Sequence, residues 1–326
     1  MKHKPIKKVW ALLLLIFIFF ISVCINQTGE NHEAQDLKKV IACFKKLNRS
    51  TEWRLTDTVR LNFRTYHPQG MVRIGNDYYM SSVEQVERPE RFNTLQDGYD
   101  RTPGKGVGHL FHFNQEGDLI SQILLGEGDI YHPGGIDYDG EFIWVPVAEY
   151  RPNSRSIIYR VNPVTLESLE IFRFQDHIGG IIHNTSNHTL CGVSWGSRRF
   201  YVWELDSGNG SANPSALPRY DMKLNGNHYI DYQDCHYLTD QLMICSGLNK
   251  YAIPNMGDIA LGGLDLVNLD LLVAVHQVPF VVWIKPDLVM NNNPFFFELV
   301  DEHLRFYFVP EDDESNLYIY DAINVE

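Results

Sequence analysis

A segment repeated along the chain restricts the fold of this protein more than its size or composition does. The clearest copy is HPGGIDYDGEFIWVPVAE, residues 132–149. Residues 67–84 align with it without a gap, and the His, the Pro, the second Gly, the turn Gly and the final Glu coincide. Weaker copies begin at His177, Asp231 and Asn293. A four-stranded propeller blade needs about 40–45 residues, so this spacing predicts β-propeller blades that carry insertions.

The two ends of the repeat region predict how the propeller closes. The last copy continues through apolar strands at 304–309 and 317–320 but lacks an outer strand. Residues 53–63 alternate as an outer strand would, and no blade precedes them. Pairing these segments would leave no open sheet edge. We therefore expect an all-β, closed propeller of four-stranded blades. Five blades are counted, and six stay open because residues 273–290 are apolar enough to hide a degenerate blade.

The first 25 residues predict export. Four lysines precede residues 9–25, an apolar run interrupted only by Ser22. Such a pattern is typical of a signal peptide or an N-terminal membrane anchor. The sequence Ile21-Ser-Val-Cys24 also resembles a lipobox, in which Cys24 would be acylated. Because positive charge precedes the apolar run, we expect the remaining chain to be extracytoplasmic, either secreted or membrane-anchored.

Residues 26–50 predict a tether followed by an amphipathic helix, before a single propeller domain at 51–326. The helix is indicated by apolar residues that recur at helical spacing, namely Leu37, Val40, Ile41, Phe44 and Leu47.

The charge of the chain limits its partners. The chain has 41 acidic and 28 basic residues and a net charge of −13. Affinity for nucleic acid or anionic membrane surfaces depends on cationic patches. We therefore expect no nucleic-acid partner, and contact with a membrane only through the N-terminal segment. The charge of the chain still allows a small-molecule ligand or a protein partner.

Two cysteines flank a short turn between expected strands. Cys235 and Cys245 would face each other on paired strands. An oxidising compartment would allow a disulfide there. The alternative is a pair of buried thiols that pack as small apolar residues.

The repeat also predicts where functional side chains meet. The first strand of each blade lines the central channel, so equivalent positions before these strands form a ring at one mouth. Imidazoles and carboxylates in such a ring suit a divalent ion such as Zn²⁺, Mn²⁺, Fe²⁺ or Ca²⁺. The candidate metal ligands are His67, His132, His177 and Asp231, and the candidate ligand-binding residues are Asn293, Ser194, Gln69 and Gln233.

Two carboxylates end the second strands of the first two copies. Glu84 and Glu149 return to the same mouth and are candidates for proton transfer. With a bound metal polarising a carbonyl group or activating water, the protein would be a hydrolase or a lyase.

Other interpretations of the ring stay open. Histidine at a blade entrance can be a scaffold residue that bonds a neighbouring backbone, and duplication of one blade would preserve it. In that case the protein would be a non-catalytic binding or scaffold propeller, with an insertion such as residues 85–107 contacting a partner. A third interpretation, a serine hydrolase that uses Ser194 and His177, follows from the motif Gly192-Val-Ser-Trp-Gly196.

Residues 132–147 and 156–163 carry a family resemblance. These segments, HPGGIDYDGEFIWVPV and SIIYRVNP, resemble a family of exported β-propeller proteins without an assigned activity. More distantly they resemble strictosidine-synthase, gluconolactonase-like and glutamine cyclotransferase propellers. The resemblance to gluconolactonases implies a divalent ion held by Glu, Asn and Asp at the mouth. This chain has three histidines there, with only Asp231 and Asn293 of the implied types, which argues against calcium-dependent lactonase chemistry.

Overall fold

The computed structural model describes residues 35–205, 217–227, 229–239, 241–255 and 257–323. The expected signal or anchor at residues 1–25, with its lipobox, lies outside these ranges. No helix within the described ranges is long and apolar enough to span a membrane.

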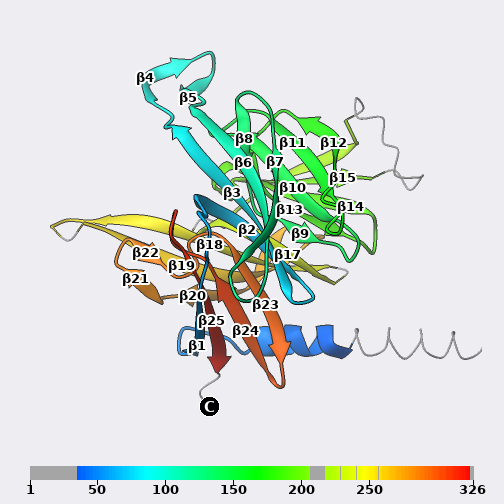
Figure 1. The fold of residues 1–326 in the computed structure, drawn as a ribbon, viewed down its shortest axis with the longest axis vertical. Helices are drawn as coiled ribbons and strands as arrows, with labels where there is room; N and C mark the ends of the chain where they lie inside the picture. The colour runs from blue at the N-terminus through cyan, green and yellow to red at the C-terminus, as the bar shows by residue number, and fades with distance from the viewer. Residues whose placement is uncertain (1–34, 206–216, 228, 240, 256, 324–326) are drawn as a thin grey trace, which may run out of the picture.

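Five antiparallel sheets form the blades of a β-propeller, as the repeat predicts (Figure 1). The first blade contains β2 (His67–Ile74), β3 (Asp77–Glu87), β6 (Lys105–Phe113) and β7 (Leu119–Leu125). The second contains β8 (Ile130–Pro133), β9 (Asp137–Tyr138), β10 (Ile143–Glu149), β11 (Ser156–Val161) and β12 (Ser168–Phe174). The third contains β13 (Ile178–Asn184), β14 (Thr189–Ser194), β15 (Arg199–Glu204) and β16 (Tyr220–Leu224), with a 3₁₀ turn at Trp195–Ser197.

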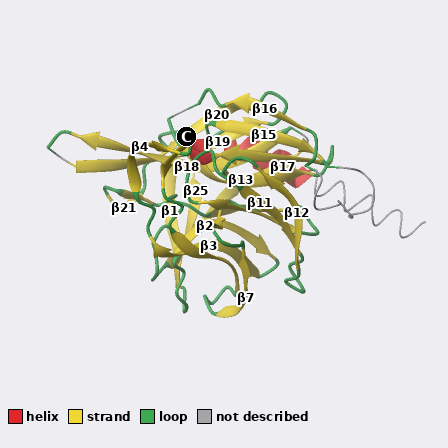
Figure 2. Cartoon of the chain, turned by 90° about the horizontal axis from the view of Figure 1, so that it is seen from above, coloured by secondary structure: helices red, strands yellow, loops and turns green. Residues whose placement is uncertain are grey.

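The last two blades complete the ring. The fourth contains β17 (Asp231–Thr239), β18 (Leu242–Ile253), β19 (Gly257–Asn268) and β20 (Val273–Phe280). The fifth contains β23 (Phe295–Val300), β24 (His303–Phe308), β25 (Asn316–Ile323) and the N-terminal strand β1 (Glu52–Arg60). Each inner strand begins within two residues of a repeat start. Figure 2 shows the same body from above, with the strands in yellow and the helix in red.

The N-terminal strand closes the propeller, and this confirms the expected closure. β1 pairs with β25, with Trp53 opposite Ala322 and Val59 opposite Leu317. The Trp53 ring packs edge-on against Phe280 at 4.5 Å between centroids, so apolar packing reinforces the closure.

Residues 273–290 do not form a sixth blade. They contain β20 and a separate two-stranded hairpin, β21 (Trp283–Lys285) with β22 (Leu288–Val289). The insertion at 85–107 contains a second hairpin, β4 (Arg91–Gln96) with β5 (Tyr99–Arg101), which projects from the first blade (Figure 1).

A helix at residues 35–44 confirms the amphipathic helix expected before the propeller. Its Phe44 side chain is fully buried, and Cys43 Sγ donates to the backbone oxygen of Glu302 at 3.5 Å. Glu302 lies in the β23–β24 turn, at the opposite end of β23 from Asn293. The helix therefore covers the face away from the repeat starts, far from the β4–β5 hairpin (Figure 1).

The inner strands meet closely at the axis. A Cβ atom added at Gly70 would lie 2.4 Å from the backbone nitrogen of Ile136, and one at Gly135 would lie 2.5 Å from the backbone oxygen of Gln233. No side chain fits at such separations, so the glycines of the repeat let strands of different blades touch. The channel is filled at this level, and open space remains at the mouth.

A disulfide joins Cys235 and Cys245 across β17 and β18, where the two residues are directly opposite. The sequence left open a disulfide or a pair of buried thiols, and the structure contains the disulfide. Cys43 and Cys191 are buried free thiols.

Candidate functional site

A cavity of about 240 Å³ opens at the mouth formed by the repeat starts. We call it the mouth cavity. It is lined by His67, Gln69, His132, Tyr150, His177, Gly179, Ser194, Trp195, Gly196, Asp231, Tyr232 and Gln233. Seven of the ten side chains expected at the site therefore lie around one space.

His132 is the most unusual of these side chains. It is 6% exposed, and neither ring nitrogen has a hydrogen-bond partner among the described residues. Its ring stacks on Tyr150 at 4.2 Å and lies 5.8 Å from the His177 ring. Burial, with the neighbouring imidazoles as smaller causes, lowers the pKa of His132 well below its ordinary value. The ring is therefore neutral at pH 7 and has one N–H group and one lone pair to offer.

His177 is held in one orientation. Its Nδ1 atom donates to the backbone oxygen of Glu149 at 2.7 Å. The proton is thereby fixed on Nδ1, so Nε2 carries the lone pair. The ring packs edge-on against Trp195 at 4.8 Å. Burial lowers the pKa of His177 to about 4, so this imidazole is also neutral at pH 7.

His67 is anchored in a similar way. Its Nδ1 atom lies 2.7 Å from Asp312 Oδ1, and Asn293 Nδ2 donates to its Nε2 atom at 3.3 Å. Asn293 does not line the mouth cavity. It contacts the site through His67.

The carboxylate of Glu149, expected at the mouth, does not line the mouth cavity. It is fully buried and binds Arg151 at 2.6 Å and Arg155 at 2.5 Å. The contribution of this residue to the site is its backbone oxygen, which orients His177.

The remaining mouth residues are polar. Asp231 forms an ion pair with Arg198 at 2.9 Å, and Ser194 Oγ accepts a hydrogen bond from the Arg199 amide at 3.0 Å. Gln69 is 5% exposed and lines the cavity.

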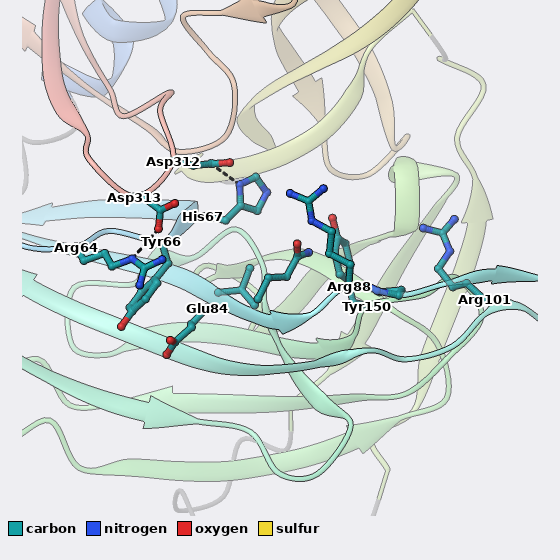
Figure 3. Close-up of a pocket in the computed structure, with 12 residues that line it drawn as sticks. Arg64, Tyr66, His67, Glu84, Arg88, Arg101, Tyr150, Asp312 and Asp313 are labelled. Carbon is teal, nitrogen blue, oxygen red and sulfur yellow. Dashed lines mark hydrogen bonds and ion pairs between the residues drawn. The ribbon is translucent and has the colours of Figure 1, made fainter.

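A second cavity, of about 480 Å³, adjoins the first. Figure 3 shows the residues that line this second cavity. We call it the outer cavity. It shares His67 and Tyr150 with the mouth cavity. Its other lining residues are Arg64, Tyr66, Val83, Glu84, Gln85, Arg88, Pro89, Arg101, Asp312 and Asp313. Glu84, expected at the mouth, lies here instead, with Oε2 3.5 Å from His109 Nε2.

The residues expected to bind a metal do not form a preformed metal site within the described ranges. Within the described ranges, no three His, Cys, Asp or Glu side chains are grouped closely enough to hold an ion as the structure stands.

Sequence reasoning missed the aromatic and cationic parts of the site. Tyr150 follows Glu149 and Trp195 follows Ser194, so both occupy one repeat position, the residue after the second strand. Aligning that position would have found them. Arg88 and Arg101 come from the insertion, which has no equivalent in other blades, and no repeat signal points to them.

The fold and the mouth define a five-bladed β-propeller with a polar cavity at one end of its axis. Residues 32–325 match the model of DUF6454, a family of unknown function, and the chain belongs to that family. None of the curated proteins compared with this chain matches it.

Several solved structures are similar to this chain at low identity. A mannose phosphorylase from Leishmania mexicana, in complex with phosphate ion, has a TM-score of 0.48 at 10% identity, over 93% of this chain and 98% of that one. A luciferin-regenerating enzyme has a TM-score of 0.44 at 9% identity, over 83% and 96%. The tail fiber of Staphylococcus aureus phage P68 has a TM-score of 0.45 at 10% identity, over 85% and 54%, so the chain spans about half of its length.

Proposed function

We propose that this protein is an exported propeller that binds a small polar ligand in the mouth cavity. The observation that supports this most is His132, whose buried ring nitrogens lack partners among the described residues. A buried polar group without a partner costs about 1–3 kcal/mol, so a ligand that bonds to it would recover that cost. Gln69 and the Nε2 atom of His177 offer further polar contacts in the same cavity.

Export is supported by two features. The disulfide between Cys235 and Cys245 would be stable in an oxidising compartment. The N-terminal sequence has the pattern of a signal or an anchor. If residues 1–25 remain as an anchor, the helix at 35–44 would put the membrane on the side of the propeller away from the mouth.

Metal binding is a second candidate function, favoured by the way two histidines are held. The Nδ1 atoms of His67 and His177 each face an oxygen atom, from Asp312 and Glu149. Histidines that bind metals through Nε2 have this arrangement. A metal at His67 would have to displace the Asn293 amide from the His67 Nε2 atom. A bound Zn²⁺ or Mn²⁺ ion would supply Lewis-acid chemistry for a hydrolase or lyase.

In an enzymatic form of this function, a neutral imidazole would accept the proton. His132 and His177 face the cavity with low pKa values, whereas the carboxylate of Glu149 is bound by two arginines.

The test compares the full-length wild-type protein with His132→Phe, which keeps the stacking ring but removes both nitrogens. Thermal shift is measured with sugars, sugar acids and hydroxy acids, and binding of ZnCl₂ and MnCl₂ is measured by titration calorimetry after EDTA treatment. We expect at least one compound or ion to bind the wild-type protein, and to bind His132→Phe at least about tenfold more weakly.

A matched control is His112→Gln, because His112 pairs with Asp77 and lines neither cavity. Equal binding to wild type and His132→Phe, or binding to neither, would remove the mouth as a ligand site. Loss of a protein partner on deletion of residues 91–101, with His132→Phe unaffected, would favour the scaffold alternative.

A further inference from the structure

The mouth cavity and the outer cavity adjoin each other. His67 and Tyr150 belong to the walls of both. A ligand seated on His132 that is larger than a few atoms would therefore reach the outer cavity. The residues that line the outer cavity then restrict the chemical class of the ligand.

Two guanidinium groups of the insertion stand at this wall. Arg88 follows β3 and Arg101 ends β5, and both line the outer cavity (Figure 3). The Arg101 guanidinium lies 4.9 Å above the ring of Trp195, which lines the mouth cavity. Arg101 therefore stands where the two cavities meet, and we call Arg88 and Arg101 the arginine pair.

Several charges around the two cavities have a partner of opposite charge, and Arg101 is one of them, because Asp100 binds it at 2.8 Å. Arg64 binds Asp313 at 2.8 Å. Asp312 accepts a hydrogen bond from His67 Nδ1 rather than from a guanidinium or ammonium group. Asp231 binds Arg198. Glu84 and Asp312 are the carboxylates of the outer cavity without an arginine or lysine partner in the described ranges, and Glu84 contacts His109 at 3.5 Å.

The arginine pair keeps unused donors. Asp100 binds the Nε and one terminal nitrogen of Arg101 at 2.9 and 2.8 Å, which leaves the other terminal nitrogen. Arg88 is exposed and has no ion pair with any residue in the described ranges. Planar guanidinium donors match the oxygen pair of a carboxylate. The unused donors of Arg88 and Arg101 therefore make this wall suited to an anion.

The mouth cavity is suited to a different part of the ligand. His132 and His177 are neutral, and Gln69, Gln233 and Ser194 are uncharged. Such groups pair with hydroxyl groups, as donors and as acceptors. Tyr150 and Trp195, with ring centroids 5.6 Å apart, offer aromatic faces to an apolar edge or ring face of the same molecule.

We propose that the ligand is a small hydroxylated carboxylic acid, of the sugar-acid or hydroxy-acid class. Its hydroxyl groups bind the imidazoles and amides of the mouth cavity, and its carboxylate binds the arginine pair. This inference rests on the proposed function and adds the charge of the ligand and the end of the site that recognises it.

The test uses compounds that differ only in the acid group. Titration calorimetry on full-length protein compares glucuronate with glucose, galacturonate with galactose, and glycerate with glycerol, at low salt. We expect at least one acid to bind at least about tenfold more tightly than its neutral counterpart, since a hydrogen bond to a charged group is worth at least that factor. Raising the salt concentration should reduce the preference.

Substitutions of the arginine pair test which residues bind the carboxylate. Arg88→Gln and Arg101→Gln should each weaken binding of the acid by about tenfold and leave binding of the neutral counterpart unchanged. Arg54→Gln is the matched control, because Arg54 lies on β1 and pairs with Glu52.

The outcomes separate this inference from the proposed function. Binding of neutral compounds as tight as that of their acids, with loss in His132→Phe, would overturn the inference and keep the mouth as the site. An acid preference that survives in the double variant Arg88→Gln/Arg101→Gln would also overturn it. Binding of no compound in the series would overturn the acid class. A metal ion that binds the wild-type protein and is lost in His132→Phe would still keep the mouth as a binding site.

Discussion

The Oδ1 atom of Asp234 accepts a hydrogen bond from the backbone nitrogen of Ile136 at 3.0 Å, and the two residues belong to different blades. The other carboxylate oxygen accepts hydrogen bonds from the amides of Met71 at 3.1 Å and Phe295 at 3.3 Å. One fully buried side chain in the fourth blade therefore joins the first, second and fifth blades at the axis. These contacts lie next to Gln233 and hold the floor of the mouth cavity.

Asp234→Asn should destabilise the protein strongly. The new amide group would direct a donor at backbone donors and leave at least one buried amide unsatisfied. We expect a loss of about 2–4 kcal/mol in the free energy of unfolding, measured by urea denaturation. Asp270→Asn, at an exposed position, is the control and should change it by less than about 0.5 kcal/mol. A small effect of Asp234→Asn would show that the axial contacts are not important for stability.

Closure by β1 can be tested at Trp53. Its ring packs against Phe280 at 4.5 Å and Phe306 at 5.2 Å, between the fourth and fifth blades. Because the side chain is only partly buried, Trp53→Ala should cost about 2–4 kcal/mol, near the lower end for large aromatic residues. Arg54→Ala, whose side chain is exposed on the same strand, should have little effect. Faster limited proteolysis near residue 60 in Trp53→Ala would accompany the loss, and equal stability of both variants would contradict it.

The sequence predicts the blades well because the first repeat starts have a fixed backbone requirement. Gly70 and Gly135 lie where strands of different blades meet, and a glycine at this position marks the first three repeat starts, the third at Gly180. The two ends of the chain were predictable for a related reason, since a missing strand and a surplus strand complement each other.

The direction of a side chain at the site was less predictable. Glu149 and Glu84 occupy one repeat position, yet Glu149 binds Arg151 and Arg155 from the following loop, whereas Glu84 lines the outer cavity. Loop residues that neutralise a charge are not part of the repeat. The arginine pair was missed for the same reason, because an insertion carries no periodic signal.

The disulfide should contribute measurably to stability. Cys235 and Cys245 are ten positions apart, and closing a loop of this size is worth about 2–3 kcal/mol. Adding dithiothreitol should lower the wild-type free energy of unfolding by about that amount. The double variant Cys235→Ala/Cys245→Ala should start lower and not respond. A response in the double variant would point to another source of the reductant effect.

Glu149→Gln separates a structural role from a catalytic one. The buried carboxylate neutralises Arg151 and Arg155, so its loss leaves a buried cation without its partner. We expect about 2–4 kcal/mol of destabilisation, less than for a pair in which both groups are buried, because Arg155 is half exposed. The affinity of the mouth for its ligand should stay within about twofold, because the side chain lines neither cavity and the backbone oxygen that holds His177 is retained. A large loss of affinity or turnover without loss of stability would support the catalytic role expected from the sequence.

His177 should make stability depend on pH in a defined window. Burial lowers its pKa to about 4 in the folded protein, against about 6.5 in the unfolded chain. Between these values the unfolded chain binds a proton that the folded protein does not, so this residue makes stability fall as pH is lowered from about 6.5 to about 4. Asp234 acts in the opposite direction, because burial raises its pKa to about 7. The informative quantity is therefore the difference between wild type and His177→Gln, which leaves Asp234 in place. With EDTA present, the stability of His177→Gln should fall less steeply over this window than that of the wild-type protein. Parallel curves would mean that the imidazole is not buried and neutral in solution, and that the mouth is more open to water than the geometry of His177 and Trp195 implies.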